Sequence, residues 1–219
     1  AADQVIKTLK SRAAMIWGID ADAVEWSDGE ARPAGANAGK FEALSLAQLA
    51  AKAESTGGPI TAAVSLNATG HMGAFGAHMV DVEVDRETGY VKVLRYTACQ
   101  DVGRAIHPDY VEGQIQGGVV QGIGWALNEE YIYNKNGHMD NAGFLDYRMP
   151  VASDLPKIDT IMIEVPNPKH PYGVKGVGEI PLVPPLAAIT NAVSHAIGKR
   201  MYELPMSPPR ILAVLDSDA

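Results

Sequence analysis

Two glycine-rich segments of this 219-residue chain hold the side chains best suited to chemistry. Residues 113–125 contain five glycines together with Gln114 and Gln121, and residues 173–179 contain three glycines and end in Glu179. A carboxylate with apolar neighbours can titrate in the range that suits a general base. Amide side chains beside glycines can hydrogen-bond a flat ligand that lies close to the backbone. The two segments therefore define the candidate site.

The first segment is expected to lie on a helix over residues 108–130. Pro108 suits a first helical turn, and Asp109 and Glu112 suit the positive end of the helix dipole. Each glycine destabilises a helix by about 0.5–1 kcal/mol relative to alanine, so something must compensate for five of them. One interpretation, which the residues alone favour, is a tightly packed crossing with another helix or with a sheet. The other is close approach of a heteroaromatic, hydrogen-bond-rich cofactor.

The second segment also has two interpretations. It lacks the Lys-Ser or Lys-Thr of a P-loop and the spacing of a dinucleotide-binding fingerprint. It can be a plain multi-turn loop with a solvated glutamate, or a shaped loop that presents Glu179 as a general base. In the second case Val177 and Ile180 would favour the protonated carboxyl, whereas the charge of Lys175 would favour the carboxylate.

Composition and charge exclude several classes of protein. The net charge of −8 argues against a nucleic-acid-binding surface, which needs clustered Lys and Arg. The single cysteine, Cys99, excludes an internal disulfide or a Cys-built cluster, and the histidines show no metal-ligand spacing, so no metal site of the chain's own is expected. No apolar run reaches the roughly 18 residues of a membrane span, and no signal segment is visible. We therefore expect no membrane contact and a cytoplasmic location.

Hydrophobic periodicity predicts an α+β fold, with a mixed sheet, hairpins and layered helices around the glycine-rich helix. Helices are expected over residues 1–17, 46–54, 108–130 and 186–197, the second capped by Ser45 and the last, the final helix of the chain, stopped by Gly198. Strands are expected over residues 23–26, 60–66, 77–84, 90–98 and 158–165, with a hairpin loop at 85–89 and a longer loop at 31–39. A small N-terminal lobe, residues 1–58, would precede a larger lobe, residues 59–219.

Taken in order, these segments resemble the C-terminal part of the molybdenum-binding subunit of the xanthine dehydrogenase, aldehyde oxidase and carbon monoxide dehydrogenase family. The similarity rests on an ordered set of segments and not on one motif. It runs through the strand and hairpin of residues 77–89, Gln-Asp-Val-Gly at 100–103, His-Pro at 107–108, the glycine-rich helix, and Gly-Val-Lys-Gly-Val-Gly-Glu at 173–179.

The resemblance implies a molybdenum hydroxylase, an oxidoreductase that oxidises an aldehyde, an N-heterocycle or a related small molecule with oxygen derived from water. In this family the glutamate that closes the loop is the base beside the molybdenum, and that position is Glu179 here. The first glutamine of the helix approaches the molybdenum–molybdopterin cofactor, and that position is Gln114. The other positions that the resemblance places near the cofactor are Gly117, Gly118, Gln121, Lys175, Gly176 and Gly178.

The resemblance also implies partners outside this chain. The family's earlier cofactor loops have no counterpart before residue 60, so we expect a fragment, or a separately encoded part, of a larger molybdenum subunit. Iron–sulfur clusters and FAD would lie on other domains or subunits. Two further functions stay open: a structural or assembly module without bound cofactor, and a small-ligand-binding domain unrelated to molybdenum.

Overall fold

The chain divides into two compact units, Ala1–Asn67 and Ala68–Ala219. The computed structural model describes residues 1–67, 70 and 72–217. The division falls later than the expected break between residues 58 and 59. Ile60 packs against the hydrophobic core of the first unit, which extends that unit past the glycines at 57 and 58.

The first unit packs helices against a small antiparallel sheet. It comprises α1 (Ala2–Trp17), β1 (Val24–Ser27), β2 (Glu30–Pro33), β3 (Leu44–Ser45) and α2 (Leu46–Ala51), with the strands in the order β1-β2-β3. Leu9 and Ala13 of α1 are buried against this sheet. Ser45 caps α2 as expected, and its hydroxyl accepts a hydrogen bond from the Gln48 N–H. Strand β2 overlaps the start of the segment expected to be a loop, because the tight turn at Asp28 returns the chain along β1.

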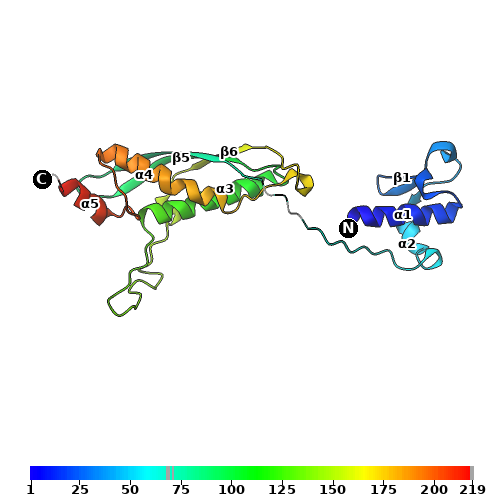
Figure 1. The fold of residues 1–219 in the computed structure, drawn as a ribbon, viewed down its shortest axis with the longest axis horizontal. Helices are drawn as coiled ribbons and strands as arrows, with labels where there is room; N and C mark the ends of the chain where they lie inside the picture. Colours follow the sequence, from blue (N-terminus) through cyan, green and yellow to red (C-terminus); the bar gives the residue numbers. More distant parts are fainter. Residues whose placement is uncertain (68–69, 71, 218–219) are drawn as a thin grey trace. The chain divides into compact units, whose positions relative to one another are not determined.

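The second unit is a mixed three-stranded sheet covered by helices. It comprises β4 (Gly76–Val84), β5 (Val91–Asp101), α3 (Pro108–Leu127), β6 (Ile158–Ile163), α4 (Val183–Ile197) and α5 (Pro208–Asp216). Strand β5 pairs antiparallel with β4 and parallel with β6, so α3 lies within the crossover that joins two parallel strands. Helices α3 and α4 run side by side along the sheet, α4 over β4 and α3 over β5 and β6 (Figure 1). The α+β class is confirmed.

Local sequence explains why these elements form. Asp85 accepts hydrogen bonds from the Glu87 N–H and the Thr88 hydroxyl and so shapes the β4–β5 hairpin, as expected for residues 85–89. Pro108 occupies the first turn of α3, and Gly198 ends α4 at a φ of 76°. These three signals are local, and all three expectations are confirmed.

Two other expectations are wrong. Residues 60–66 form no strand, because their alternating pattern finds no partner strand in the described structure. The helix 186–197 is not the final one, because α5 follows it. Pro208 and Pro209 stand in the first turn of α5, where the missing N–H groups do no harm.

Helix α4 lies within a long apolar segment. The segment Ile180–Ile197, with a mean hydropathy of 1.3, is long and apolar enough to cross a membrane, which corrects the expectation that no run reaches that length. Its residues Ile189, Val193 and Ile197 are buried in the core that the sheet and α3 share. Only 28% of the segment is buried, so packing in that core accounts for part of its apolar character.

A tight crossing between α3 and the chain that enters α4 dominates the second unit. A methyl group added at Gly118 would lie 2.6 Å from Cγ of Pro181, and one added at Gly122 would lie 2.7 Å from the ring of Pro185. Both glycines are buried. By contrast, a methyl group at Gly117 would meet nothing within 4 Å. The crossing interpretation therefore holds for Gly118 and Gly122, while Gly117 faces open space.

Alanine substitutions should separate these two kinds of glycine. Gly118→Ala and Gly122→Ala should each destabilise the second unit by about 1–3 kcal/mol, because the added methyl group overpacks the crossing. Gly117→Ala is the matched control, and it should stabilise the helix by about 0.5–1 kcal/mol. Native-state hydrogen exchange of the α3 amides measures both effects within this unit. Equal effects at the three positions would show that the crossing is not close-packed.

Candidate cofactor-facing site

Gln114 and the loop of residues 173–179 lie side by side near the beginning of α3. Gln114 is exposed, and a methyl group added at Gly178 would lie 3.4 Å from its Oε1 atom. The bare backbone at Gly178 thus leaves room for the amide. Pro181 packs against the backbone of Gly118, and this contact fixes the end of the loop on α3. The structure therefore brings together Gln114 and the loop that ends in Glu179.

Glu179 stands at the point where the loop turns toward α4. Its backbone carbonyl accepts a hydrogen bond from the Leu182 N–H at 3.2 Å, in the short 3₁₀ turn Ile180–Leu182. Its side chain is exposed and, among the residues that the structure describes, forms no hydrogen bond or ion pair. A carboxylate in this position can accept a proton or a hydrogen bond from a bound group.

The beginning of the loop is fixed by its backbone. The carbonyl of Gly173 accepts hydrogen bonds from the N–H groups of Arg104 and Asn167, both at 3.0 Å. Gly103 has a φ of 66°, and a methyl group on it would lie 2.7 Å from that same carbonyl oxygen. The loop therefore lies directly on the connection between β5 and α3.

A buried ion pair fixes the middle of the loop. Lys175 Nζ lies 2.5 Å from Oδ2 of Asp101 at the end of β5, and the side chains are only 3 % and 8 % exposed. Lys175 also donates a hydrogen bond to the carbonyl of Gly73 at 3.2 Å. Burial alone would raise the pKa of Asp101, but the hydrogen bonds from Lys175 and the Gly103 N–H, with the Lys175 charge, outweigh it and leave that pKa lowered.

This pairing changes the role expected for Lys175. Its charge is matched by Asp101 instead of acting mainly on Glu179, and its side chain anchors the loop. Sequence reasoning did not assign Asp101 to the site, because its partner lies 74 residues away in the chain. The signal that could have found it is a lone lysine between glycines together with an acidic residue before Gly103.

Only some of the other predicted cofactor-binding residues lie near Gln114 and Glu179. A methyl group on Gly176 would meet nothing within 4 Å, as at Gly117, so both leave backbone open to a ligand. Gly118 is covered by Pro181 and supports the loop from beneath. Gln121 is exposed, but it lies about 10 Å farther along α3 than Gln114. The structure thus groups Gln114, Gly176 and Glu179 and leaves Gln121 at the margin.

The region around the loop offers groups that a flat cofactor with many hydrogen-bonding atoms could contact. A hollow of about 400 Å³ adjoins the loop and is lined partly by Lys175, Gly176 and Ile180. An exposed amide and an unpaired carboxylate stand beside open glycine backbone, as such a ligand requires. Among the described residues, no three His, Cys, Asp or Glu side chains group as metal ligands. Gln114, Gly176 and Glu179 are therefore the candidate cofactor-facing residues.

Comparison with known proteins identifies the family. Residues 1–156 match the model of the molybdopterin cofactor-binding domain, which is most of the chain. The chain therefore belongs to the molybdopterin cofactor-binding domain family. The resemblance to the molybdenum-binding subunits of the xanthine dehydrogenase and aldehyde oxidase class is confirmed.

Individual relatives agree with this assignment. The putative xanthine dehydrogenase molybdenum-binding subunit XdhA of Escherichia coli is 40% identical over 156 residues, which is 71% of this chain and 21% of that protein. The large subunit of nicotine 6-hydroxylase of Paenarthrobacter nicotinovorans is 42% identical over 63% of this chain and 17% of its own length. Quinoline 2-oxidoreductase from Pseudomonas putida 86 superposes with a TM-score of 0.84 and 30% identity, covering 99% of this chain and 29% of that structure. The chain thus spans less than a third of each.

Lys175→Met should expose the energetic role of the buried pair. Removing one partner of such a pair costs about 3–5 kcal/mol, because the other charge stays buried and unpaired. In the unaltered chain the pKa of Asp101 is lower than in the unfolded chain, where it is about 4. The ionised carboxylate therefore stabilises the fold above about pH 4, and this contribution is lost as the pH falls through the folded-state pKa. In the variant, burial should favour the protonated carboxyl. The loss of unfolding free energy in the variant should therefore be largest at neutral pH and should shrink below about pH 4.

Denaturant unfolding at pH 7 and at about pH 3, below the unfolded pKa of an aspartate, measures this difference. Lys169→Met is the control, because Lys169 is an exposed lysine only six residues away. A deficit that is small or independent of pH would show that the pair does not hold the loop.

Proposed function

We propose that this chain forms one wall of the active site of a molybdenum hydroxylase, which oxidises an aldehyde, an N-heterocycle or a related small molecule with oxygen derived from water. The observation that carries the proposal is the placement of the unpaired Glu179 carboxylate on a fixed loop beside the exposed Gln114 amide. The names of the relatives support it, since they include a xanthine dehydrogenase, a nicotine hydroxylase and a quinoline oxidoreductase.

Each residue of this wall has a separate task. Gln114 offers an amide donor and acceptor to the edge of the cofactor, and the bare backbone of Gly176 and Gly178 allows close approach. Glu179 accepts the proton of the attacking hydroxyl group and so acts as the general base. The Lys175–Asp101 pair keeps the loop in position. The bound molybdenum–molybdopterin cofactor supplies the redox chemistry.

The other parts of the enzyme lie outside this chain. We propose that the remainder of the molybdenum subunit supplies the opposite wall of the cofactor site. Iron–sulfur clusters and a flavin on other domains or subunits would carry the electrons away, since the single cysteine here cannot bind a cluster. A cytoplasmic location is part of the same proposal.

Glu179→Gln tests the role of the base in the assembled enzyme. Glutamine keeps the shape of the side chain but cannot accept a proton at neutral pH. The rate at which substrate reduces the molybdenum centre, measured by rapid mixing, should fall by about 10²–10⁴-fold. The molybdenum content should be unchanged. The matched control is Glu203→Gln, which alters an exposed glutamate away from the loop and should leave the rate unchanged. If the Glu179 variant reacts within a few-fold of the parent, the loop has only a structural role.

The isolated 219-residue chain should bind no molybdopterin cofactor tightly, because a ligand of that size must be largely enclosed. Metal and pterin analysis of the purified chain and of the full complex tests this expectation. Stoichiometric cofactor on the isolated chain would show that one wall is sufficient. A full complex without molybdenum would favour the alternative of an assembly module.

A further inference from the structure

A second cavity lies toward the other end of α3. It has a volume of about 320 Å³ and is walled by the rings of Trp125, Tyr131 and Tyr147, with Glu129 and Glu130 beside them. Trp125 follows Gln114 by 11 residues, which is about 16 Å along the helix axis. The cavity is therefore separate from the cofactor-facing site. Its size is near the lower end for small-molecule sites, about 300 Å³.

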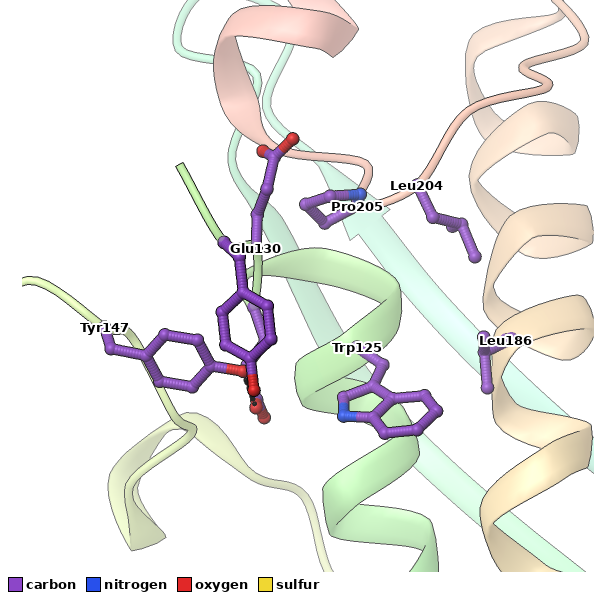
Figure 2. Close-up of a pocket in the computed structure, with 8 residues that line it drawn as sticks. Trp125, Glu130, Tyr147, Leu186, Leu204 and Pro205 are labelled. Atoms are coloured by element: carbon purple, nitrogen blue, oxygen red, sulfur yellow. Dashed lines mark hydrogen bonds between the residues drawn. The ribbon is translucent and has the colours of Figure 1, made fainter. Parts of the chain in front are cut away.

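Only one of the two carboxylates at this cavity is neutralised by a cation. Arg210 of α5 donates a hydrogen bond to Oε1 of Glu130 at 2.6 Å. Figure 2 shows the Glu130 side chain extending toward α5 and away from Trp125. Glu129 has no cationic partner among the described residues. The two carboxylates and one guanidinium thus leave a net charge of −1 beside the aromatic rings.

The Glu129 carboxylate is held in place from two sides. The Tyr147 hydroxyl donates a hydrogen bond to its Oε2 at 2.8 Å. Its Oε1 lies so close to Gly124 that a methyl group there would overlap it. Burial, together with the adjacent Glu129 charge, raises the pKa of Tyr147 to about 12, so the phenol remains a donor at neutral pH.

The aromatic and apolar walls leave room for a bulky cation. Trp125 is 43% exposed and Tyr131 64% exposed, and the Tyr131 and Tyr147 ring centroids are 5.6 Å apart. Figure 2 shows Leu186 across from the Trp125 indole, with Pro205 and Leu204 above them in the view. Aromatic faces attract cations, and tryptophan does so most strongly.

We propose that this cavity binds a small alkylated ammonium ion, held by the Glu129 charge and by the faces of Trp125, Tyr131 and Tyr147. The scarcity of acceptors decides between cations. A guanidinium carries five N–H donors, and Glu129 Oε2 already accepts a hydrogen bond from Tyr147, so the mainly aromatic and apolar walls would leave most of those donors unsatisfied. A quaternary ammonium has no N–H groups to satisfy, and it gains from both the charge and the aromatic faces.

Titration of the 219-residue chain with choline tests the proposal. The probe is the Trp125 indole N–H resonance, identified by its loss in Trp125→Phe, and choline chloride replaces sodium chloride at constant ionic strength. The resonance should shift saturably. The neutral isostere 3,3-dimethylbutanol should bind at least about tenfold more weakly, because it lacks the charge.

Variants test whether Glu129 and the aromatic residues are responsible for choline binding. Glu129→Gln keeps an acceptor for the Tyr147 hydroxyl and should weaken choline binding by about tenfold or more, whereas Glu83→Gln on the exposed side of β4 should not change it. Tyr131→Leu should weaken binding with the Trp125 resonance retained, and Trp26→Phe in the first unit is its aromatic control. Equal binding of the neutral isostere, an unaffected Glu129→Gln variant, or tighter binding of methylguanidinium than of choline would each overturn the proposal.

Discussion

The close approach of α3 to the chain at Pro181 and Pro185 is the constraint on which the second unit depends. Helix α3 can pass this close only because Gly118 and Gly122 carry no side chains. The crossing closes the core between the helices and the sheet, and it also fixes the point where the loop ends. Glu179 stands two residues before Pro181, so the same contact that stabilises the fold determines where the carboxylate lies. The conformational cost of glycines in a helix is thus offset by the close packing that they allow.

The Lys175–Asp101 pair adds a second anchor, at the middle of the loop. The crossing holds the end of the loop and the ion pair holds its middle, while the Gly173 carbonyl binds its beginning. A loop fixed at three points can present a carboxylate in one orientation, as general-base catalysis requires. The lowered pKa of Asp101 is a consequence of this structural pairing, and it does not identify Asp101 as a catalytic group.

The parts of this structure that sequence predicted well are those with local causes. The start of α3 at Pro108, the hairpin before β5 and the stop at Gly198 each depend on residues within one turn of the signal, whereas α3 ends at Leu127, three residues before the expected end. The pairing of Lys175 with Asp101 depends on tertiary structure, because the lysine between glycines and the acidic residue before Gly103 lie 74 residues apart, beyond the reach of any local pattern. The same limit explains residues 60–66, whose strand-like pattern has no described partner. Sequence also could not tell that Gly118 packs while its neighbour Gly117 faces open space.

The central claim is that Gln114 and Glu179 face the cofactor from one wall. Anomalous diffraction at the molybdenum absorption edge, from crystals of the assembled subunit, tests this claim most directly because it locates the metal. We expect the metal on the open side of the loop, with the Glu179 carboxylate within about 3 Å of a group held at the metal, directly or through one water. A metal located elsewhere, with Glu179 facing bulk solvent, would contradict the account.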